Sequence, residues 1–151
     1  IVVPSGNLLG GQLQSVGYVR NYPVGIKKSA TLFGIERFTG KTAVLVESPL
    51  DVVRLASTCD GVQGLATFGA YVSDKQLDLL YAVATKVIIA MDNDDAGISS
   101  SKSMFRNIRP FRDGVLWLNY KNTKAKDIGD MRDEEMLDAI STATAVPGWV
   151  L

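Results

Sequence analysis

The sequence contains no histidine and a single cysteine, Cys59. One cysteine cannot form a disulfide framework or a cysteine-based zinc site within the chain. Without histidine, no imidazole is available as a general acid or base. Any catalysis by this chain must therefore use carboxylates, lysines or hydroxyl groups.

The chain also lacks an excess of either charge and lacks a long apolar run. Its 151 residues include 16 basic and 16 acidic side chains, so attraction to nucleic acid must come from local clusters. No apolar stretch approaches the roughly 20 residues that span a bilayer, and no signal-peptide pattern opens the chain. We therefore expect a cytoplasmic protein with no membrane partner. Because the first residue is Ile1 rather than methionine, we also expect a piece of a longer protein.

Short β-branched runs alternate with amphipathic stretches from Thr42 onward. This alternation predicts βαβ units, and hence an α/β fold with a mainly parallel sheet flanked by helices. Glycine and proline interrupt the runs before Thr42, which predicts a short β-rich segment instead. The predicted organisation is a β-rich unit over 1–41, an α/β domain over 42–146 and a tail over 147–151.

Acidic residues close two of the predicted strands. Glu47 ends the strand predicted at 43–47, and Asp92 follows the strand predicted at 86–91. Ligands of open α/β sheets collect at the carboxyl ends of the strands, and Asp94 lies close enough in sequence to face the same point. Carboxylate oxygens suit Mg²⁺ or Mn²⁺, whereas two carboxylates about 4 Å apart repel by roughly 4 kcal/mol at an effective dielectric of about 20. These three acids therefore predict a metal site.

These motifs have two other possible interpretations. An aspartate at the start of a helix commonly caps it, and this role is open to Asp94 and Asp95. Glu47 has no such role, because a glutamate that ends an apolar strand is costly to bury unpaired. A phosphate-binding loop over Gly34 and Gly40-Lys41-Thr42 is rejected, because five residues rather than four separate the glycines and the motif leads into a strand.

Two longer motifs surround these acids: Val44-Leu45-Val46-Glu47-Ser48-Pro49-Leu50-Asp51-Val52 and Ile88-Ile89-Ala90-Met91-Asp92-Asn93-Asp94-Asp95-Ala96-Gly97. They resemble the glutamate motif and the Asp-x-Asp-x-x-Gly motif of Toprim domains. Thr67-Phe68-Gly69-Ala70 is similar to the glycine-containing loop of that family. Lys126-Asp127-Ile128-Gly129-Asp130 resembles the acidic loop that follows the fourth strand in primases. The resemblance covers about residues 42–140.

The segment before Thr42 resembles one particular class of Toprim proteins. Residues 18–23 and 27–35 resemble the end of the basic subdomain that precedes Toprim in DnaG-type primases of bacteria and phages. The resemblance implies that the catalytic residues are Glu47, Asp92 and Asp94, that the metal ligands are Glu47, Asp51, Asp92, Asp94 and Asp127, and that Lys28, Arg20 and Gly69 bind nucleotide or DNA. Three positions depart from the family pattern: Ser48 replaces a glycine, Gln14 an expected arginine, and Gly129 a common second aspartate.

The resemblance also implies an activity, namely template-directed synthesis of short RNA primers by a nucleotidyltransferase that uses one or two Mg²⁺ or Mn²⁺ ions. The implied partners are a single-stranded DNA template, ribonucleoside triphosphates, a replicative helicase and a zinc-binding primase module outside this chain. The location is the host cytoplasm if a phage encodes the protein. Two alternatives remain open: a metal-dependent nuclease, and a non-catalytic metal- or nucleic-acid-binding piece of a split primase. The isolated chain can be inactive even with an intact site.

Overall fold

A four-stranded parallel sheet forms the centre of the computed structural model, which describes residues 11–22 and 24–147. The strand order is β4-β3-β5-β6, with all neighbours parallel. The strands are β3 (Thr42–Val46), β4 (Gln63–Ala66), β5 (Lys86–Ile89) and β6 (Val115–Trp117). The predicted α/β fold with a parallel sheet is confirmed.

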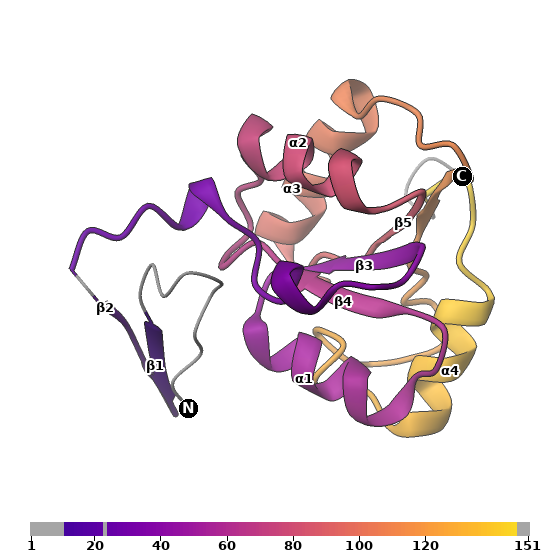
Figure 1. Cartoon of the computed structure of the whole chain (residues 1–151). Coiled ribbons are helices and arrows are strands. Elements are labelled where there is room, and N and C mark those ends of the chain that lie inside the picture. Colours follow the sequence, from indigo (N-terminus) through magenta and orange to yellow (C-terminus); the bar gives the residue numbers. More distant parts are fainter. Residues whose placement is uncertain (1–10, 23, 148–151) are drawn as a thin grey trace.

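Helices cover both faces of this sheet (Figure 1). On one face lie α1 (Pro49–Thr58) and α4 (Asp133–Ser141), and on the other lie α2 (Asp74–Val83) and α3 (Asp95–Asn107). In β3, Val44 and Val46 join one apolar core and Ala43 and Leu45 join the other. All four side chains are 0% exposed. A strand covered on both faces must be apolar throughout, which explains the unbroken apolar run before Glu47.

The segment before the sheet begins with an antiparallel hairpin of β1 (Gly11–Ser15) and β2 (Tyr18–Tyr22), which lies to one side of the α/β body (Figure 1). Two 3-10 turns follow, η1 (Lys28–Ala30) and η2 (Ile35–Arg37). Between them Leu32 is completely buried, and Phe33 exchanges two backbone hydrogen bonds with Ala66, at 2.9 and 3.1 Å. This part of the segment therefore packs onto the domain, and the division at residue 42 stays a prediction.

The chain after α4 returns to the sheet. Thr144 exchanges two backbone hydrogen bonds with Trp117, so it covers the outer edge of β6. Of the predicted tail, Pro147 is buried, and the remaining four residues lie outside the described part of the chain, as do residues 1–10 and Pro23. Among the helices of residues 11–22 and 24–147, none is long and apolar enough to cross a membrane.

Candidate metal and nucleic-acid site

Glu47 and Asp92 meet where the sheet reverses its winding. The chain passes from β3 through α1 to β4 on one side, and from β5 through α3 to β6 on the other. The crevice between β3 and β5 is therefore the topological switch point, where ligands of open α/β sheets bind. Leu45 is in register with Ile89, so the two acids leave the strands at similar heights. The Asp92 backbone N–H donates to Glu47 Oε1 at 3.1 Å.

Asp94 has two roles in this arrangement. It is the N-cap of α3, and its Oδ1 accepts a hydrogen bond from the Gly97 backbone N–H at 3.0 Å. The capping interpretation is therefore correct for one oxygen of Asp94. Its other oxygen, Oδ2, lies 3.2 Å from the Lys126 ammonium. A cap and a cation contact are thus compatible within one carboxylate.

Gly97 lets α3 begin directly against the backbone of Asp92. A Cβ atom at this position would collide with the Asp92 carbonyl oxygen and would lie 2.8 Å from its backbone nitrogen. The glycine of the Asp-x-Asp-x-x-Gly motif therefore has a packing function here. It keeps Asp92 and Asp94 on the two sides of one tight turn.

Asp51 and Asp127 approach the site from α1 and from the loop after β6. Asp51 is 3% exposed, and its Oδ1 accepts a hydrogen bond from the Gly129 backbone N–H at 3.1 Å. Asp127 Oδ1 accepts from the Asp130 backbone N–H at 2.9 Å. A Cβ at position 129 would lie only 2.9 Å from Asp51 Oδ1 and 3.1 Å from Asp127 Oδ1. This crowding explains why position 129 carries a residue without a side chain.

The acids are crowded enough to perturb one another. Burial and the neighbouring Asp92 raise the pKa of Glu47 to about 7. Burial, Asp127 and Asp92 raise the pKa of Asp51 to about 7, and burial and Asp127 also raise the pKa of Asp92. The Gly97 N–H and Lys126 instead lower the pKa of Asp94. A cluster of crowded carboxylates of this kind is stabilised by protonation or by a bound cation.

The sequence interpretation missed Lys126, whose ammonium lies 3.2 Å from Asp94 Oδ2 and 3.7 Å from Asp92 Oδ2. A signal was available, since this lysine immediately precedes Asp127 in the acidic loop. Within residues 11–22 and 24–147, no three carboxylate or thiol side chains are placed to hold a metal ion together. The donors are nonetheless hard oxygens, and the ammonium group stands in for a cation between two of them. The residues therefore fit a hard divalent ion, provided that Lys126 moves.

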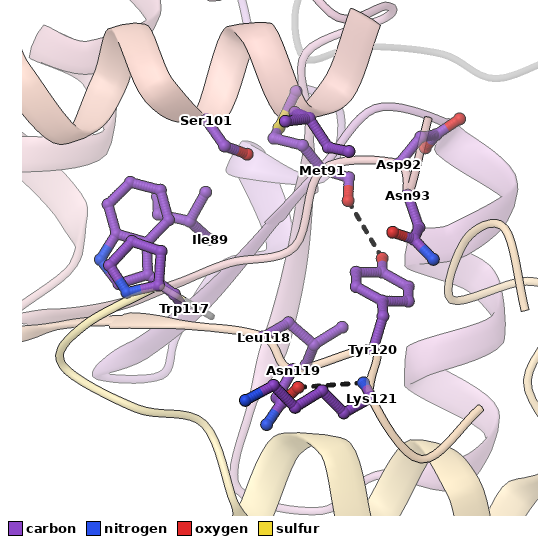
Figure 2. A pocket seen from close by; sticks show the side chains of 12 residues that line it. Ile89, Met91, Asp92, Asn93, Ser101, Trp117, Leu118, Asn119, Tyr120 and Lys121 are labelled. Carbon is purple, nitrogen blue, oxygen red and sulfur yellow. Dashed lines mark hydrogen bonds between the residues drawn. The ribbon is translucent and has the colours of Figure 1, made fainter. Parts of the chain in front are cut away.

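A cavity of about 330 Å³ lies beside Asp92 at the ends of β5 and β6 (Figure 2). Tyr120 lines it, and its hydroxyl donates to the Met91 carbonyl at 3.1 Å. Burial and the surrounding acids raise the pKa of Tyr120, so the phenol keeps its proton and remains a donor. The hydrogen bond fixes the backbone immediately before Asp92. Tyr120 thus supports the site, although no sequence motif identified it.

The residues predicted to bind nucleotide or DNA are not all at the acidic edge. Lys28 Nζ donates to the Phe68 carbonyl at 3.0 Å, and the Gly69 backbone N–H donates to the Glu47 carbonyl at 3.1 Å. Phe68 has a φ of 65°, unusual for a residue other than glycine, and Gly69 has a φ of 141°. Lys28 and Gly69 therefore border the site through one short loop.

Arg20 lies on the exposed strand β2. Its guanidinium interacts with two tyrosines of the same hairpin, donating to the Tyr18 hydroxyl at 3.4 Å and lying 5.8 Å from the centre of the Tyr22 ring. These contacts do not connect Arg20 to the carboxylates. Its predicted role therefore has less structural support than that of Lys28.

Gln76 is a second residue that the sequence interpretation missed. It is 1% exposed, and its amide nitrogen donates to the carbonyls of Lys28, Thr31 and Thr67 at 3.2, 2.9 and 3.0 Å. Its Oε1 accepts from the Ser73 backbone N–H at 3.0 Å, which completes a capping box for α2. The Ser-x-x-Gln spacing was a usable signal for the cap. It gave no indication that Gln76 also joins the Lys28 segment to the loop after β4.

Comparison with known proteins identifies the class. The sequence model of the Toprim-like family matches residues 44–131, more than half of the chain, so the chain belongs to the Toprim-like family. It is 32% identical over 95 residues to the DNA primase of Borreliella burgdorferi, an alignment that covers 59% of this chain and 18% of that protein.

Solved primase structures share the fold. The zinc-binding and RNA polymerase domains of Aquifex aeolicus primase match with a TM-score of 0.69 and 25% identity, over 97% of this chain and 40% of that chain. The DnaG primase catalytic domain bound to single-stranded DNA matches with a TM-score of 0.74 and 18% identity, over 95% of this chain and 50% of that chain. The resemblance to the catalytic core of DnaG-type primases is thereby confirmed. The chain spans half or less of each of these relatives.

Proposed function

We propose that this chain is part of a primase catalytic core that synthesises short RNA primers on a DNA template at a divalent-metal site. The observation that carries the proposal is the meeting of Glu47 and Asp92 at the switch point of the sheet, with Asp94 held beside them. Membership of the Toprim-like family and similarity to DNA primases support it.

In this proposal Glu47, Asp92 and Asp94 hold one or two Mg²⁺ or Mn²⁺ ions. Bound there, the metal would lower the pKa of the attacking 3′-hydroxyl, orient the triphosphate and neutralise charge on the pyrophosphate leaving group. The protein contributes position: the Asp92 N–H orients Glu47, and the α3 cap orients Asp94. Asp127 is a further candidate ligand. Asp51 is also a candidate, but its burial and its bond to Gly129 suit it better to positioning the Asp127 loop.

The nucleic-acid side of the proposal rests on Lys28, Gly69 and Arg20. Phosphate contacts by such residues position a strand without reading its sequence, and they weaken as salt rises. A similar DnaG domain has been solved with single-stranded DNA, and the similar Aquifex aeolicus structure includes a zinc-binding domain. By analogy we propose a single-stranded template, ribonucleoside triphosphates, a zinc-binding module, a helicase partner and a cytoplasmic location for the parent protein.

Primer synthesis by the parent protein that contains this chain tests the proposal. Asp92→Ala and Asp94→Ala should each reduce synthesis about a hundredfold or more, because each removes preorganised charge from the reacting centre. Asp60→Ala, at an exposed acid away from the site, should leave synthesis unchanged. Thermal melts would verify that the variants fold. Undiminished synthesis by both site variants would refute the proposal, and cleavage of the DNA in place of synthesis would favour a nuclease.

A further inference from the structure

The ammonium of Lys126 lies within ion-pair distance of two carboxylates of the proposed metal site. Its ammonium lies 3.2 Å from Asp94 Oδ2 and 3.7 Å from Asp92 Oδ2. We propose that Lys126 is a built-in countercation: it neutralises these acids until a divalent ion displaces it, and the displaced ammonium then contacts the phosphates of a bound nucleoside triphosphate. The inference rests on the metal site of the proposed function.

The backbone of Lys126 is fixed while its ammonium end is free to move. The Lys126 carbonyl accepts a hydrogen bond from the Asn93 N–H at 2.6 Å, and three residues later Gly129 is bonded to Asp51. The Lys126 side chain is nevertheless 57% exposed. A lysine stem is flexible and carries a compact charge, so the ammonium can leave the carboxylates while the loop stays in place.

Charge decides which cation occupies the position. A divalent ion is attracted to the crowded carboxylates more strongly than a single ammonium, and the two cations repel each other at this separation. The ammonium must therefore move away when the metal binds, yet its fixed backbone keeps it at the rim of the site. The triphosphate of a nucleotide held by the metal would bring anionic oxygens to that rim, and lysine binds such oxygens as a point charge.

Manganese binding to the purified protein, measured by calorimetry, tests the displacement. Lys126→Met should bind Mn²⁺ about three- to tenfold more tightly than the wild type, as expected from the loss of two competing ion pairs of ordinary strength. Lys124→Met is the matched control, because Lys124 is an exposed lysine two residues earlier in the same loop. It reports the effect of removing a nearby positive charge that does not occupy the site. Lys126→Gln provides a second, polar variant should the methionine impair folding.

Nucleotide binding to the Mn²⁺-loaded protein tests the second step. A non-hydrolysable ribonucleoside triphosphate should bind Lys126→Met at least about threefold more weakly than it binds Lys124→Met, because the ammonium at the rim is missing. The two measurements should therefore move in opposite directions in the same variant. Equal nucleotide affinities would overturn the proposed contact with phosphate.

The metal measurement separates this inference from the proposed function. If the wild type binds Mn²⁺ and Lys126→Met binds it no more tightly than Lys124→Met, the role of Lys126 is wrong while the metal site stands. If neither the wild type nor either Lys126 variant binds Mn²⁺, the metal site itself is wrong. Binding by the Lys126 variants alone would support the inference most directly, because the ammonium would then be the group that keeps the metal out.

Discussion

The α/β domain and the N-terminal hairpin are stabilised in different ways. Strand β3 has four consecutive side chains that are 0% exposed, with helices on both faces. In the hairpin, Tyr18, Val19 and Tyr22 are 45–55% exposed, and a two-stranded hairpin has little stability of its own. The carboxylates therefore extend from a closely packed sheet, whereas Arg20 extends from an exposed strand of the hairpin. The metal part of the proposed function can be tested in this chain more directly than the nucleic-acid part.

Lys28 lies between these extremes. It belongs to the segment before the sheet, yet it is bound to the loop after β4 and is held there by Gln76. A substitution in the turn that holds the acids and a substitution that loosens the Lys28 segment should therefore have separable effects.

Gly97→Ala should cause the largest loss of stability. The added methyl group would overlap the Asp92 carbonyl oxygen, so α3 or the Asp92 turn must shift. We expect a destabilisation of about 3 kcal/mol, because overpacking against backbone outweighs the roughly 1 kcal/mol that alanine gains over glycine in a helix. Urea denaturation measures this change. Ser99→Ala, in the same helix, should change stability by less than about 0.5 kcal/mol. A Gly97→Ala variant as stable as the wild type would contradict the close contact.

The acids at the strand ends were predictable because a parallel sheet follows a general rule. An apolar run ending in Glu47 and another followed by Asp92 are visible in the sequence, and parallel strands bring their carboxyl ends to one edge. The contact of Asp51 with Gly129 and the position of the Lys126 ammonium were not predictable in this way. Both depend on how the loop after β6 folds back onto α1 and the β5 turn. Sequence spacing does not encode the distance between such remote segments.

The same reasoning explains why the structure supports the predicted binding residues to different degrees. Lys28, Arg20 and Gly69 were selected by resemblance, which gives an order along the chain and no geometry. The structure connects Lys28 and Gly69 to the Glu47 loop but holds Arg20 in contacts with Tyr18 and Tyr22.

Gln76→Leu should weaken the attachment of the Lys28 segment to the loop after β4 while leaving the acids in place. The change removes the donor shared by the carbonyls of Lys28, Thr31 and Thr67, and we expect a destabilisation of about 2 kcal/mol. Trypsin should cleave after Lys27 and Lys28 faster in this variant, because the hydrogen bonds from Gln76 to their segment are lost. Lys75→Leu, at the preceding exposed position, should cleave at the wild-type rate. Faster cleavage with unchanged Mn²⁺ affinity would sharpen the distinction between the two regions. An unchanged cleavage rate would show that Gln76 does not hold the Lys28 segment to the domain.

The pH dependence of stability should reveal the crowded carboxylates. Glu47 and Asp51 have pKa values of about 7 in the folded chain, against ordinary values of 4.5 and 3.8. Between about pH 4 and 7 the folded state therefore retains protons that the unfolded state has lost. The stability associated with these protons is fully present below the unfolded pKa values and is lost as pH rises through 7.

For the metal-free protein we expect the melting temperature to fall between pH 5 and pH 8. The loss stays below the roughly 1.4 kcal/mol per pKa unit that the full shifts would give, because solvent screens the partly exposed Glu47. The salt-bridged acids Asp133 and Glu135 do not mask the effect, because their lowered pKa values place their titration below this range. Glu47→Gln should flatten the profile, and Mg²⁺ should restore stability more at pH 8 than at pH 5. A melting temperature that rises over this range without metal would show that these carboxylates are not crowded, and the electrostatic case for a cation at the switch point would then fail.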